Sequence, residues 1–300
     1  MKKIIVTGAT SMIGIALIEC AVSNNVEVYA IIRPDTKRRD RLPHSDLLHL
    51  IECKLTELER IKEIPLDCDV LYHFAWVYTA KNMRDDALLQ EENIKITLDC
   101  VKLAQRCGCY KFIGAGSQAE YGRVNGIIDG KTKCQPEVAY GVAKYAAGLL
   151  SKKLCEDLDM IHIWGRIFSV YGKYDNPDTM LDYAIKSFLH GNYARFSSGK
   201  QRWDYLFEQD AGKIFYLLGV RADESKTYRI ANGKARCLRN YIAILAQKMH
   251  AENLCIFDES CDSQIGIEAD ISDLVADIGY TPDTSFESGI GIMINEYKQY

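Results

Sequence analysis

Short apolar runs alternate with longer stretches of helical periodicity along the first half of the sequence. Strands are predicted where β-branched and other apolar residues cluster over about four to seven positions, and helices where apolar residues recur at three- and four-residue spacing. The predicted strands are residues 3–6, 26–32, 49–53, 69–74, 111–115 and 161–167, and the predicted helices are residues 15–23, 85–107 and 137–158. Strands alternating with helices indicate a doubly wound α/β fold with a parallel sheet.

The pattern changes after residue 172. One helix is predicted at residues 181–190 and one strand at 203–207, with Asp210 as the N-cap of the next helix. The remainder, from residue 227, is a series of short elements. We therefore predict a smaller C-terminal α/β lobe that binds the substrate. The predicted division is a first domain of residues 1–172, to which 201–222 return, and a lobe of residues 173–200 and 223–300.

A turn containing two glycines joins the first predicted strand to the first helix. Glycine is needed where the backbone turns tightly against a pyrophosphate, whose charge the amides at the helix start can hold. The strand–turn–helix–strand unit is typical of a Rossmann-type domain. The predicted cofactor contacts here are Gly8, Thr10, Ser11, Met12, Ile13 and Gly14. Ser11 replaces the central glycine of the usual spacing, which leaves the affinity or orientation of the cofactor open.

The end of the second strand bears on the type of cofactor. NAD-binding domains usually carry an acid there, which bonds the ribose 2′-hydroxyl. This chain has Arg33 instead, and its planar guanidinium could pair with a 2′-phosphate. We therefore expect NADP(H) to be preferred, with NAD(H) possible. The basic residues of 37–41 are interpreted as a solvated loop.

The ends of the other predicted strands supply the remaining cofactor contacts. Small residues after the fourth strand would let a dinucleotide lie across its tip, and Ala75 fits this role. Trp76 is large and could instead border the substrate, whereas His73 is expected to be a satisfied core histidine. The predicted contacts in these segments are Leu55, Phe74, Ala75, Trp76, Asn93, Ala115, Gly116 and Ile167.

Three polar residues near the fifth strand could carry acid–base chemistry. Tyr140 and Lys144 are four residues apart, so they share one face of the predicted helix. An ammonium near a phenol would lower the phenol pKa from its usual value of about 10. Ser117, at the end of the strand, could polarise a carbonyl group beside it. The alternative for the Tyr140–Lys144 pair alone is ordinary helix surface.

Composition narrows the class of protein. The chain has 300 residues, of which 48% are hydrophobic and 26% charged, enough to build a large core. A net charge of −4 implies no general affinity for nucleic acid. The 11 cysteines lack the spacing of zinc sites, so no metal is expected, and many free thiols indicate a reducing cytoplasm. No segment has the apolar length needed to span a membrane.

Together these motifs resemble the extended short-chain dehydrogenase/reductase family, particularly its nucleotide-sugar branch. The resemblance covers nearly the whole chain, from Thr7-Gly8 through the Tyr140–Lys144 pair to Gly289. It implies that Tyr140 is the acid/base and that Ser117 bonds the reacting oxygen. It also implies that Lys144 lowers the pKa of Tyr140 and holds the nicotinamide ribose, while Asn93 supports the active site.

Departures from the family motifs narrow the reaction. Family dehydratases carry Asp-Glu directly after the catalytic serine or threonine, and enzymes that epimerise C3 and C5 carry a cysteine two residues after it. Gln118 and Ala119 occupy these positions here, so neither chemistry is expected. The predicted substrate contacts are Gln118, Ser169, Arg202 and Trp203. Two of them, Ser169 and Trp203, replace an asparagine and an arginine of the family, and Trp203 could stack on the substrate or pack between the lobes.

The leading hypothesis is NADPH-dependent reduction of a nucleotide-linked 4-keto-6-deoxy hexose. The alternatives are an NAD-dependent 4-epimerase of UDP-hexose type, a non-catalytic NADP-sensing protein and a reductase of small carbonyl compounds. The two long helices, 85–107 and 137–158, are predicted to form a homodimer interface, or else merely to cover the sheet. Nucleic acid and membranes are not expected as partners.

Overall fold

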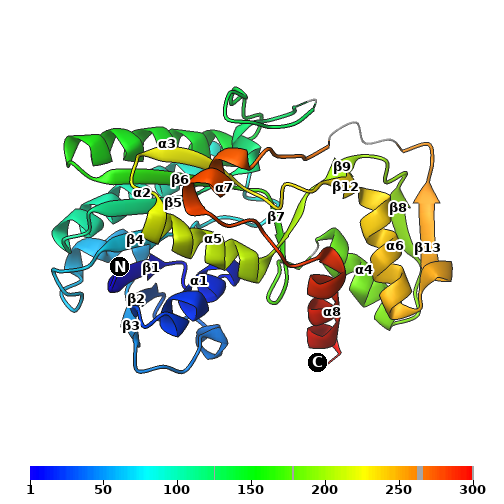
Figure 1. Cartoon of the computed structure of the whole chain (residues 1–300), viewed down its shortest axis with the longest axis horizontal. Helices are drawn as coiled ribbons and strands as arrows, with labels where there is room; N and C mark the ends of the chain where they lie inside the picture. Colours follow the sequence, from blue (N-terminus) through cyan, green and yellow to red (C-terminus); the bar gives the residue numbers. More distant parts are fainter. Residues whose placement is uncertain (125, 178, 262–265, 299–300) are drawn as a thin grey trace.

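The computed structural model describes the chain except for residues 125, 178, 262–265 and 299–300, so these parts of the predicted domains lie outside the described residues. A seven-stranded sheet forms its centre, in the order β11-β6-β5-β4-β1-β2-β3 with every neighbouring pair parallel (Figure 1). Its strands are β1 Lys3–Thr7, β2 Glu27–Ile32, β3 Leu48–Glu52, β4 Val70–His73, β5 Lys111–Ser117, β6 Ile161–Ile167 and β11 Lys226–Ile230. The predicted doubly wound α/β fold is confirmed.

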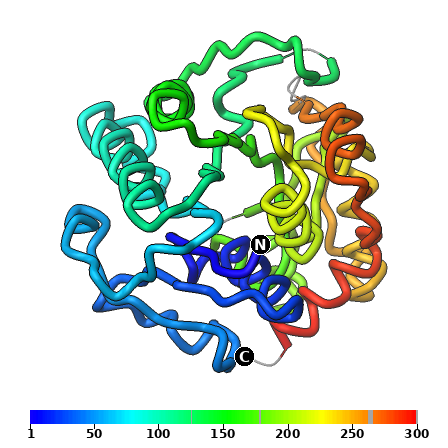
Figure 2. The backbone as a smooth tube through the Cα atoms, turned by 60° about the vertical axis from the view of Figure 1, so that its left-hand side comes forward, coloured from blue at the N-terminus to red at the C-terminus, as the bar shows by residue number. Residues whose placement is uncertain are grey.

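Helices cover both faces of this sheet. Alternate residues of β1 point to opposite faces, so Ile4 and Val6 join one core cluster and Ile5 joins the other. Figure 2 shows α2 and α3 side by side on one side of the sheet and α1 on the other. The helices are α1 Met12–Ser23 and α5 Glu208–Arg221 on the first cluster, and α2 Ala87–Arg106 and α3 Ala139–Asp157 on the second side.

Glycines let α3 approach the sheet closely. The Trp164 indole of β6 fills the space between strand and helix. A Cβ atom on Gly114 would lie 2.2 Å from this ring, and one on Gly148 would lie 2.8 Å from it. Because side chains at these positions would collide with the indole, the glycines set the distance between α3 and β5, and thereby the depth at which Tyr140 and Lys144 lie.

A second group of elements surrounds its own core beside the sheet (Figure 1). Three helices and a pair of parallel strands form it: α4 Met180–Leu189, α6 Leu238–Met249, α8 Phe286–Tyr297, β8 Ala194–Ser197 and β13 Cys255–Asp258. Two small strand pairs connect it to the sheet: β7 Ser169–Tyr171 with β10 Tyr205–Phe207, and β9 Arg202–Trp203 with β12 Arg236–Cys237. The short elements are η1 Arg39–Arg41, η2 Leu55–Arg60, η3 Gln118–Glu120, η4 Glu252–Leu254 and α7 Ser272–Ile278.

Two details differ from the sequence-based expectations. Strand β11 falls in the range predicted for the smaller lobe, yet it pairs with β6 at the edge of the large sheet. The predicted N-cap role of Asp210 is wrong, because α5 begins at Glu208 with Phe207 as its N-cap. The buried Asp210 carboxylate instead accepts hydrogen bonds from the Tyr280 hydroxyl and the Thr284 amide, which fastens the segment after α7 to α5.

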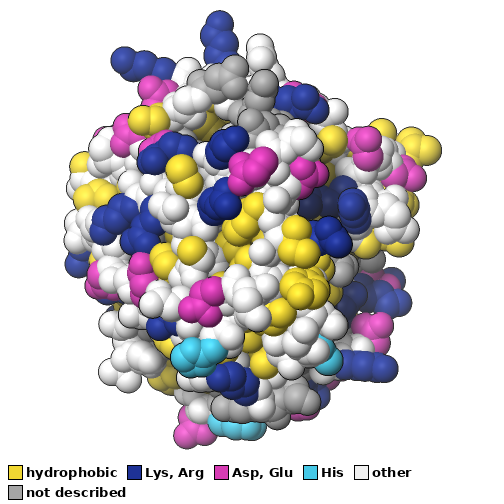
Figure 3. Space-filling view, turned by 90° about the vertical axis from the view of Figure 1, so that its right-hand side faces the viewer, with side chains coloured by type: hydrophobic (Ala, Val, Ile, Leu, Met, Phe, Trp, Pro, Cys, Tyr) yellow, Lys and Arg dark blue, Asp and Glu magenta, His cyan; other side chains and the backbone are white. Residues whose placement is uncertain are grey.

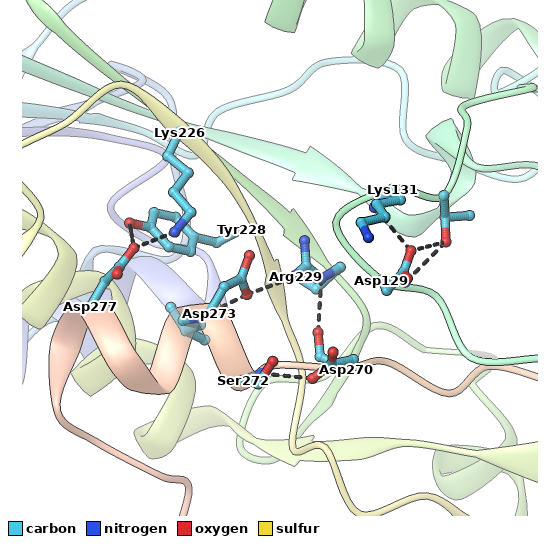
Figure 4. A network of polar contacts seen from close by, with 11 residues as sticks. Asp129, Lys131, Lys226, Tyr228, Arg229, Asp270, Ser272, Asp273 and Asp277 are labelled. Carbon is cyan, nitrogen blue, oxygen red and sulfur yellow. Dashed lines mark hydrogen bonds and ion pairs between the residues drawn. The ribbon is translucent and has the colours of Figure 1, made fainter.

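Polar contacts hold α7 against the edge strand β11 (Figure 4). The Arg229 side chain donates to the Asp270 carbonyl oxygen at 2.8 Å and pairs with Asp273. Asp277 accepts from the Tyr228 hydroxyl at 2.6 Å. Tyr228 and Arg229 are neighbours on β11, and each contacts a carboxylate of α7, so a hydrogen bond and an ion pair help to hold this strand from the C-terminal part in the sheet.

The exposed surface is mixed in charge. On the face that Figure 3 presents, basic and acidic side chains are interspersed with apolar ones. In the part of the chain that the structure describes, no helix is long and apolar enough to cross a membrane. The cysteines in this part are all free thiols, and most of them are buried.

Candidate active site

The strand order reverses between β1 and β4, and the predicted cofactor residues meet there. In parallel α/β sheets, ligands bind beyond the carboxyl ends of the strands at such a switch point. β1 ends at Thr7, β4 at His73 and β5 at Ser117, so three of the predicted segments reach the same edge.

The turn after β1 has the geometry of a phosphate-binding turn. Gly8 has a φ of +70°, and a Cβ atom there would lie 2.5 Å from the Ala75 amide nitrogen, so the turn fits closely against the end of β4. Ser11 is the N-cap of α1, and its hydroxyl accepts from the Gly14 amide at 3.1 Å. The amides of Met12 and Ile13 have no partner within the helix. These residues fit the pyrophosphate of a dinucleotide, and Ser11 is accommodated as a cap.

Arg33 directly follows β2 at the same edge. Its side chain is exposed and makes no hydrogen bond or ion pair within the described residues. Arg39, in contrast, pairs with Glu52 of β3. Arg33 is thus a basic residue at the end of β2 whose side chain has no partner among the described residues. Leu55 begins η2 and packs on the α2-side core.

The segment after β4 is held by α2. The Asn93 amide both accepts from the Val77 amide at 2.8 Å and donates to the Val77 carbonyl oxygen at 3.2 Å. The buried Gln90 accepts from the Trp76 indole at 2.9 Å. His73 is a satisfied core histidine as expected, because it bonds with two threonine hydroxyls and burial lowers its pKa to about 3.

Ser117 ends β5 above a buried charge network. Its amide donates to the Glu120 carboxylate at 2.8 Å, and its hydroxyl accepts from the Ala119 amide at 3.2 Å. Glu120 is fully buried and also accepts from the Trp164 indole at 3.0 Å and from Arg166 at 2.7 Å. One carboxylate therefore ties the serine to β6. Glu120 was not predicted from the sequence, although an acid directly after a buried strand end was a signal.

Tyr140 lies beside Ser117 in the first turn of α3. The two hydroxyl groups interact, and this interaction lowers the pKa of Tyr140, but burial of the phenol outweighs it and raises that pKa above its ordinary value. The net shift of the Tyr140 pKa is therefore upward, opposite to the lowering expected from Lys144. Arg84, in the loop after β4, is a cation that lowers this pKa, and the sequence did not predict it.

The Lys144 amine is buried and has other partners. It donates to the Ala115 carbonyl oxygen at 2.6 Å and lies 3.7 Å from the centroid of the Trp76 ring. Its distance to the centroid of the Tyr140 ring is 5.9 Å. Burial lowers the pKa of Lys144 to about 7, and the Glu120 charge opposes this shift. Spacing correctly placed Lys144 on the Tyr140 face of the helix, but it did not predict these partners.

Of the remaining predicted cofactor residues, three line the same strands and one borders the turn. Ala115 and Gly116 lie in β5, and Ile167 ends β6 opposite Ser117. A Cβ atom on Gly116 would lie 2.3 Å from the Trp164 indole nitrogen and 2.5 Å from the Glu120 carboxylate, so this glycine is required by packing. Phe74 packs against Phe215 of α5.

The four predicted substrate contacts lie on three elements, η3, β7 and β9. Ser169 begins β7. Gln118 begins η3, and its buried side-chain oxygen has no hydrogen-bond partner among the described residues. The Arg202 guanidinium is engaged by Glu268 and the Ala235 carbonyl oxygen. Trp203 packs against both the sheet core and the second core, and in the part of the chain that the structure describes its buried indole nitrogen has no hydrogen-bond partner. Packing between the lobes thus accounts for the Trp203 ring, while its N–H group remains available.

Comparisons with known proteins agree with this arrangement. The model of the NAD dependent epimerase/dehydratase family matches residues 4–232. The chain is 23% identical to the dTDP-4-dehydro-6-deoxyglucose reductase of Escherichia coli, over 98% of this chain and 97% of that protein.

Solved structures show the same fold. The UDP-N-acetylglucosamine 4-epimerase of Methanobrevibacter ruminantium M1, in complex with UDP-N-acetylmuramic acid, superposes with a TM-score of 0.87 at 21% identity, covering 99% of this chain and 98% of that one. The UDP-glucuronic acid 4-epimerase of Bacillus cereus, in complex with NAD, superposes with a TM-score of 0.85 at 21% identity, covering 99% and 97%. The chain belongs to the NAD-dependent epimerase/dehydratase family of extended short-chain dehydrogenases/reductases, whose members are enzymes that act on nucleotide sugars.

Proposed function

We propose that this enzyme reduces a carbonyl group of a nucleotide-linked sugar, with a 4-keto-6-deoxy hexose as the preferred substrate class and NADPH as the preferred reductant. One observation carries the proposal: Ser117, Tyr140 and Lys144 converge at the carboxyl end of β5, beside the glycine turn of β1. This edge joins acid–base groups to a dinucleotide-binding turn.

The cofactor would be held by the β1 turn and the neighbouring strand ends. The amides of Met12 and Ile13 would bind the pyrophosphate, and Gly8 and Ala75 carry no bulky side chain that would prevent its close approach to the backbone. When bound, the nicotinamide supplies the hydride. The unpartnered Arg33 at the end of β2, where no acid stands, supports a 2′-phosphate and hence NADPH.

Tyr140 would give its phenolic proton to the reacting oxygen, and the Ser117 hydroxyl would donate a hydrogen bond to the same oxygen. The carbonyl carbon gains a hydride and the oxygen gains a proton, which yields the alcohol. Burial raises the pKa of Tyr140, so the phenol is protonated at neutral pH, as a proton donor must be. The neighbours of Ser117, Gln118 and Ala119, carry no acid or thiol for chemistry at a second carbon.

A second candidate is 4-epimerisation of a nucleotide-linked hexose with NAD. The high structural similarity to two 4-epimerases, one of them in complex with NAD, favours it. The same three side chains would then first remove a proton from the C4 hydroxyl and later return one. The two candidates differ in net redox change.

Incubation with a panel of nucleotide sugars tests both. A reductase oxidises NADPH in the presence of 4-keto-6-deoxy sugars, followed by the loss of absorbance of the reduced nicotinamide. An epimerase interconverts UDP-hexoses without net change in that absorbance. Tyr140→Phe should abolish either activity while cofactor binding is retained. Firm cofactor binding without turnover of any sugar would contradict both candidates and favour the NADP-sensing or small-carbonyl alternative.

We further propose a homodimer formed by the exposed faces of α2 and α3. Large apolar side chains are exposed on these helices; Leu88 of α2 is 81% exposed and Leu149 of α3 is 53% exposed. Such side chains gain most by burial against a second copy. The division into a cofactor domain and a substrate lobe remains a proposal as well, with β11 assigned to the cofactor domain.

A further inference from the structure

Residues 77–86, the later part of the loop between β4 and α2, are fastened at their start and in their middle. At its start, Asn93 holds both backbone groups of Val77. In its middle, the Gln90 amide donates to the carbonyl oxygens of Tyr78 at 2.9 Å and Met83 at 3.1 Å. Two side chains of α2 thus fix the course of the loop, and its last residues lie in a defined place.

That place is the first turn of α3. The N-cap of α3, Val138, has no side chain that can cap the helix. The loop supplies the missing acceptors: the Arg84 carbonyl oxygen accepts from the Tyr140 amide at 2.8 Å, and the Asp85 carboxylate accepts from the Ala139 amide at 2.9 Å. Because helix starts otherwise leave such amides unpaired, these two contacts fix the start of α3.

The same contacts place a cation on the phenol. The Arg84 guanidinium lies 4.2 Å from the centroid of the Tyr140 ring. We propose that Arg84 is the positioning residue of the acid/base: its backbone caps the turn that carries Tyr140, and its guanidinium stabilises the phenolate through the ring and the hydroxyl. Arg84 thereby performs in this chain the electrostatic role expected of Lys144.

The charges around the phenol determine whether replacement of Arg84 raises or lowers the pKa of Tyr140. Arg84 faces Tyr140 from the loop, Lys144 from the same helix, and Glu120 from η3, where it is paired with Arg166 of β6. Glu120 raises the pKa of Tyr140, whereas Arg84 and the Ser117 hydroxyl lower it. Burial and Glu120 both raise the pKa of Tyr140. When the Arg84 guanidinium is removed, less opposes them, so the pKa of the phenol must rise.

The test is a titration of the enzyme labelled with ¹³C at the tyrosine ζ carbon. The Tyr140 signal is assigned by its absence from the Tyr140→Phe spectrum. Arg84→Gln is expected to raise the pKa of Tyr140 by about one unit, the size of an ion–phenolate attraction at a partly solvated site. Arg84→Lys, which retains the charge, should restore at least half of the shift.

Two controls separate charge from structure. Lys81→Gln removes an equal charge from the same loop, and the described residues include no hydrogen bond or ion pair of Lys81. Asp85→Ala removes the other cap contact and leaves the guanidinium in place. Neither should move the pKa of Tyr140 by more than a few tenths of a unit. No shift in Arg84→Gln, or an equal shift in either control, would overturn the proposal.

The consequence for turnover rests on the proposed function. If Tyr140 donates the proton, the high-pH limb of the pH profile of kcat/KM moves upward with the phenol pKa in Arg84→Gln, and Arg84→Lys moves it back. The NMR titration needs no substrate. A shifted phenol with no turnover of any sugar would therefore count against the proposed function alone, and turnover with an unshifted phenol would count against the role of Arg84.

Discussion

Replacement of Glu120 should destabilise the protein more than any other single change beside the site. Its carboxylate is fully buried and accepts three hydrogen bonds, from the Ser117 amide, the Trp164 indole and the Arg166 guanidinium. Glu120→Ala removes all three acceptors. Glu120→Gln keeps one oxygen that can accept from the Ser117 amide and the Trp164 indole. The Arg166 guanidinium, however, would then face a neutral amide group in place of a carboxylate.

The magnitude follows from the burial of the pair. The Arg166 side chain is 13% exposed, so its charge would remain poorly solvated after the carboxylate is lost. Removal of one partner of a buried ion pair typically costs about 3–5 kcal/mol. Typical domains are stable by only about 5–15 kcal/mol, so the loss is large enough to measure without ambiguity. We expect about 3 kcal/mol for Glu120→Gln and about 4–5 kcal/mol for Glu120→Ala.

Urea unfolding followed by far-UV circular dichroism gives the free energy of unfolding without relying on Trp164, whose fluorescence the substitution itself would alter. The matched control is Arg166→Gln, which leaves the carboxylate unpaired. The double variant Glu120→Gln/Arg166→Gln should cost clearly less than the sum of the single variants, because neither charge is then left alone. A cost below about 1 kcal/mol for Glu120→Gln, or simple additivity, would refute the view that this pair supports the site.

Three further predictions concern other parts of the molecule. Gly291→Ala in α8 should stabilise the protein by about 0.5–1 kcal/mol, since among the described residues the new Cβ atom would meet only a lysine amine. Gly289→Ala should destabilise the protein, because a Cβ atom there would lie 2.3 Å from the Tyr171 hydroxyl, and the melting temperatures of the two variants check both expectations. Burial raises the pKa of Glu208 from 4.5 to about 8, so its contribution to stability is lost as pH rises between these values, and Glu208→Gln should raise the melting temperature more at pH 8 than at pH 5. Leu149→Glu should convert the proposed dimer to a monomer in light scattering, with the fold unchanged by circular dichroism.

The fold of the first domain could be predicted from the sequence, because buried parallel strands are short apolar runs and the segments between them have the periodicity of amphipathic helices. Each of the six strands predicted before residue 172 is present, with ends shifted by at most two residues, whereas the strand predicted at 203–207 is divided into β9 and β10. β11 escaped assignment because three of its five residues, Lys226 to Ile230, are polar, so it lacks the continuous apolar run of a buried parallel strand. The place of β11 in the sheet depends on polar contacts with α7, which lies more than forty residues later in the chain. A pattern of neighbouring residues cannot indicate such contacts.

The site was only half accessible for a similar reason. Helical spacing fixed the shared face of Tyr140 and Lys144, but the partners of each group come from elsewhere in the chain. Trp76 and the Ala115 carbonyl oxygen engage the lysine, and Arg84 reaches the phenol from a polar loop. Periodicity describes one element at a time, whereas a pKa depends on every charge that the fold brings close.

The phenol pKa also bears on which reaction this enzyme performs. A reductase uses Tyr140 as a proton donor, so a phenol that titrates well above neutral pH is already in the working state. A 4-epimerase must first take a proton from the sugar hydroxyl, so it benefits from a phenol that titrates nearer to neutral pH. In this structure burial and Glu120 raise the pKa of Tyr140 against Ser117 and Arg84, and the balance lies above the ordinary value. This direction agrees with the proton-donor role proposed for Tyr140.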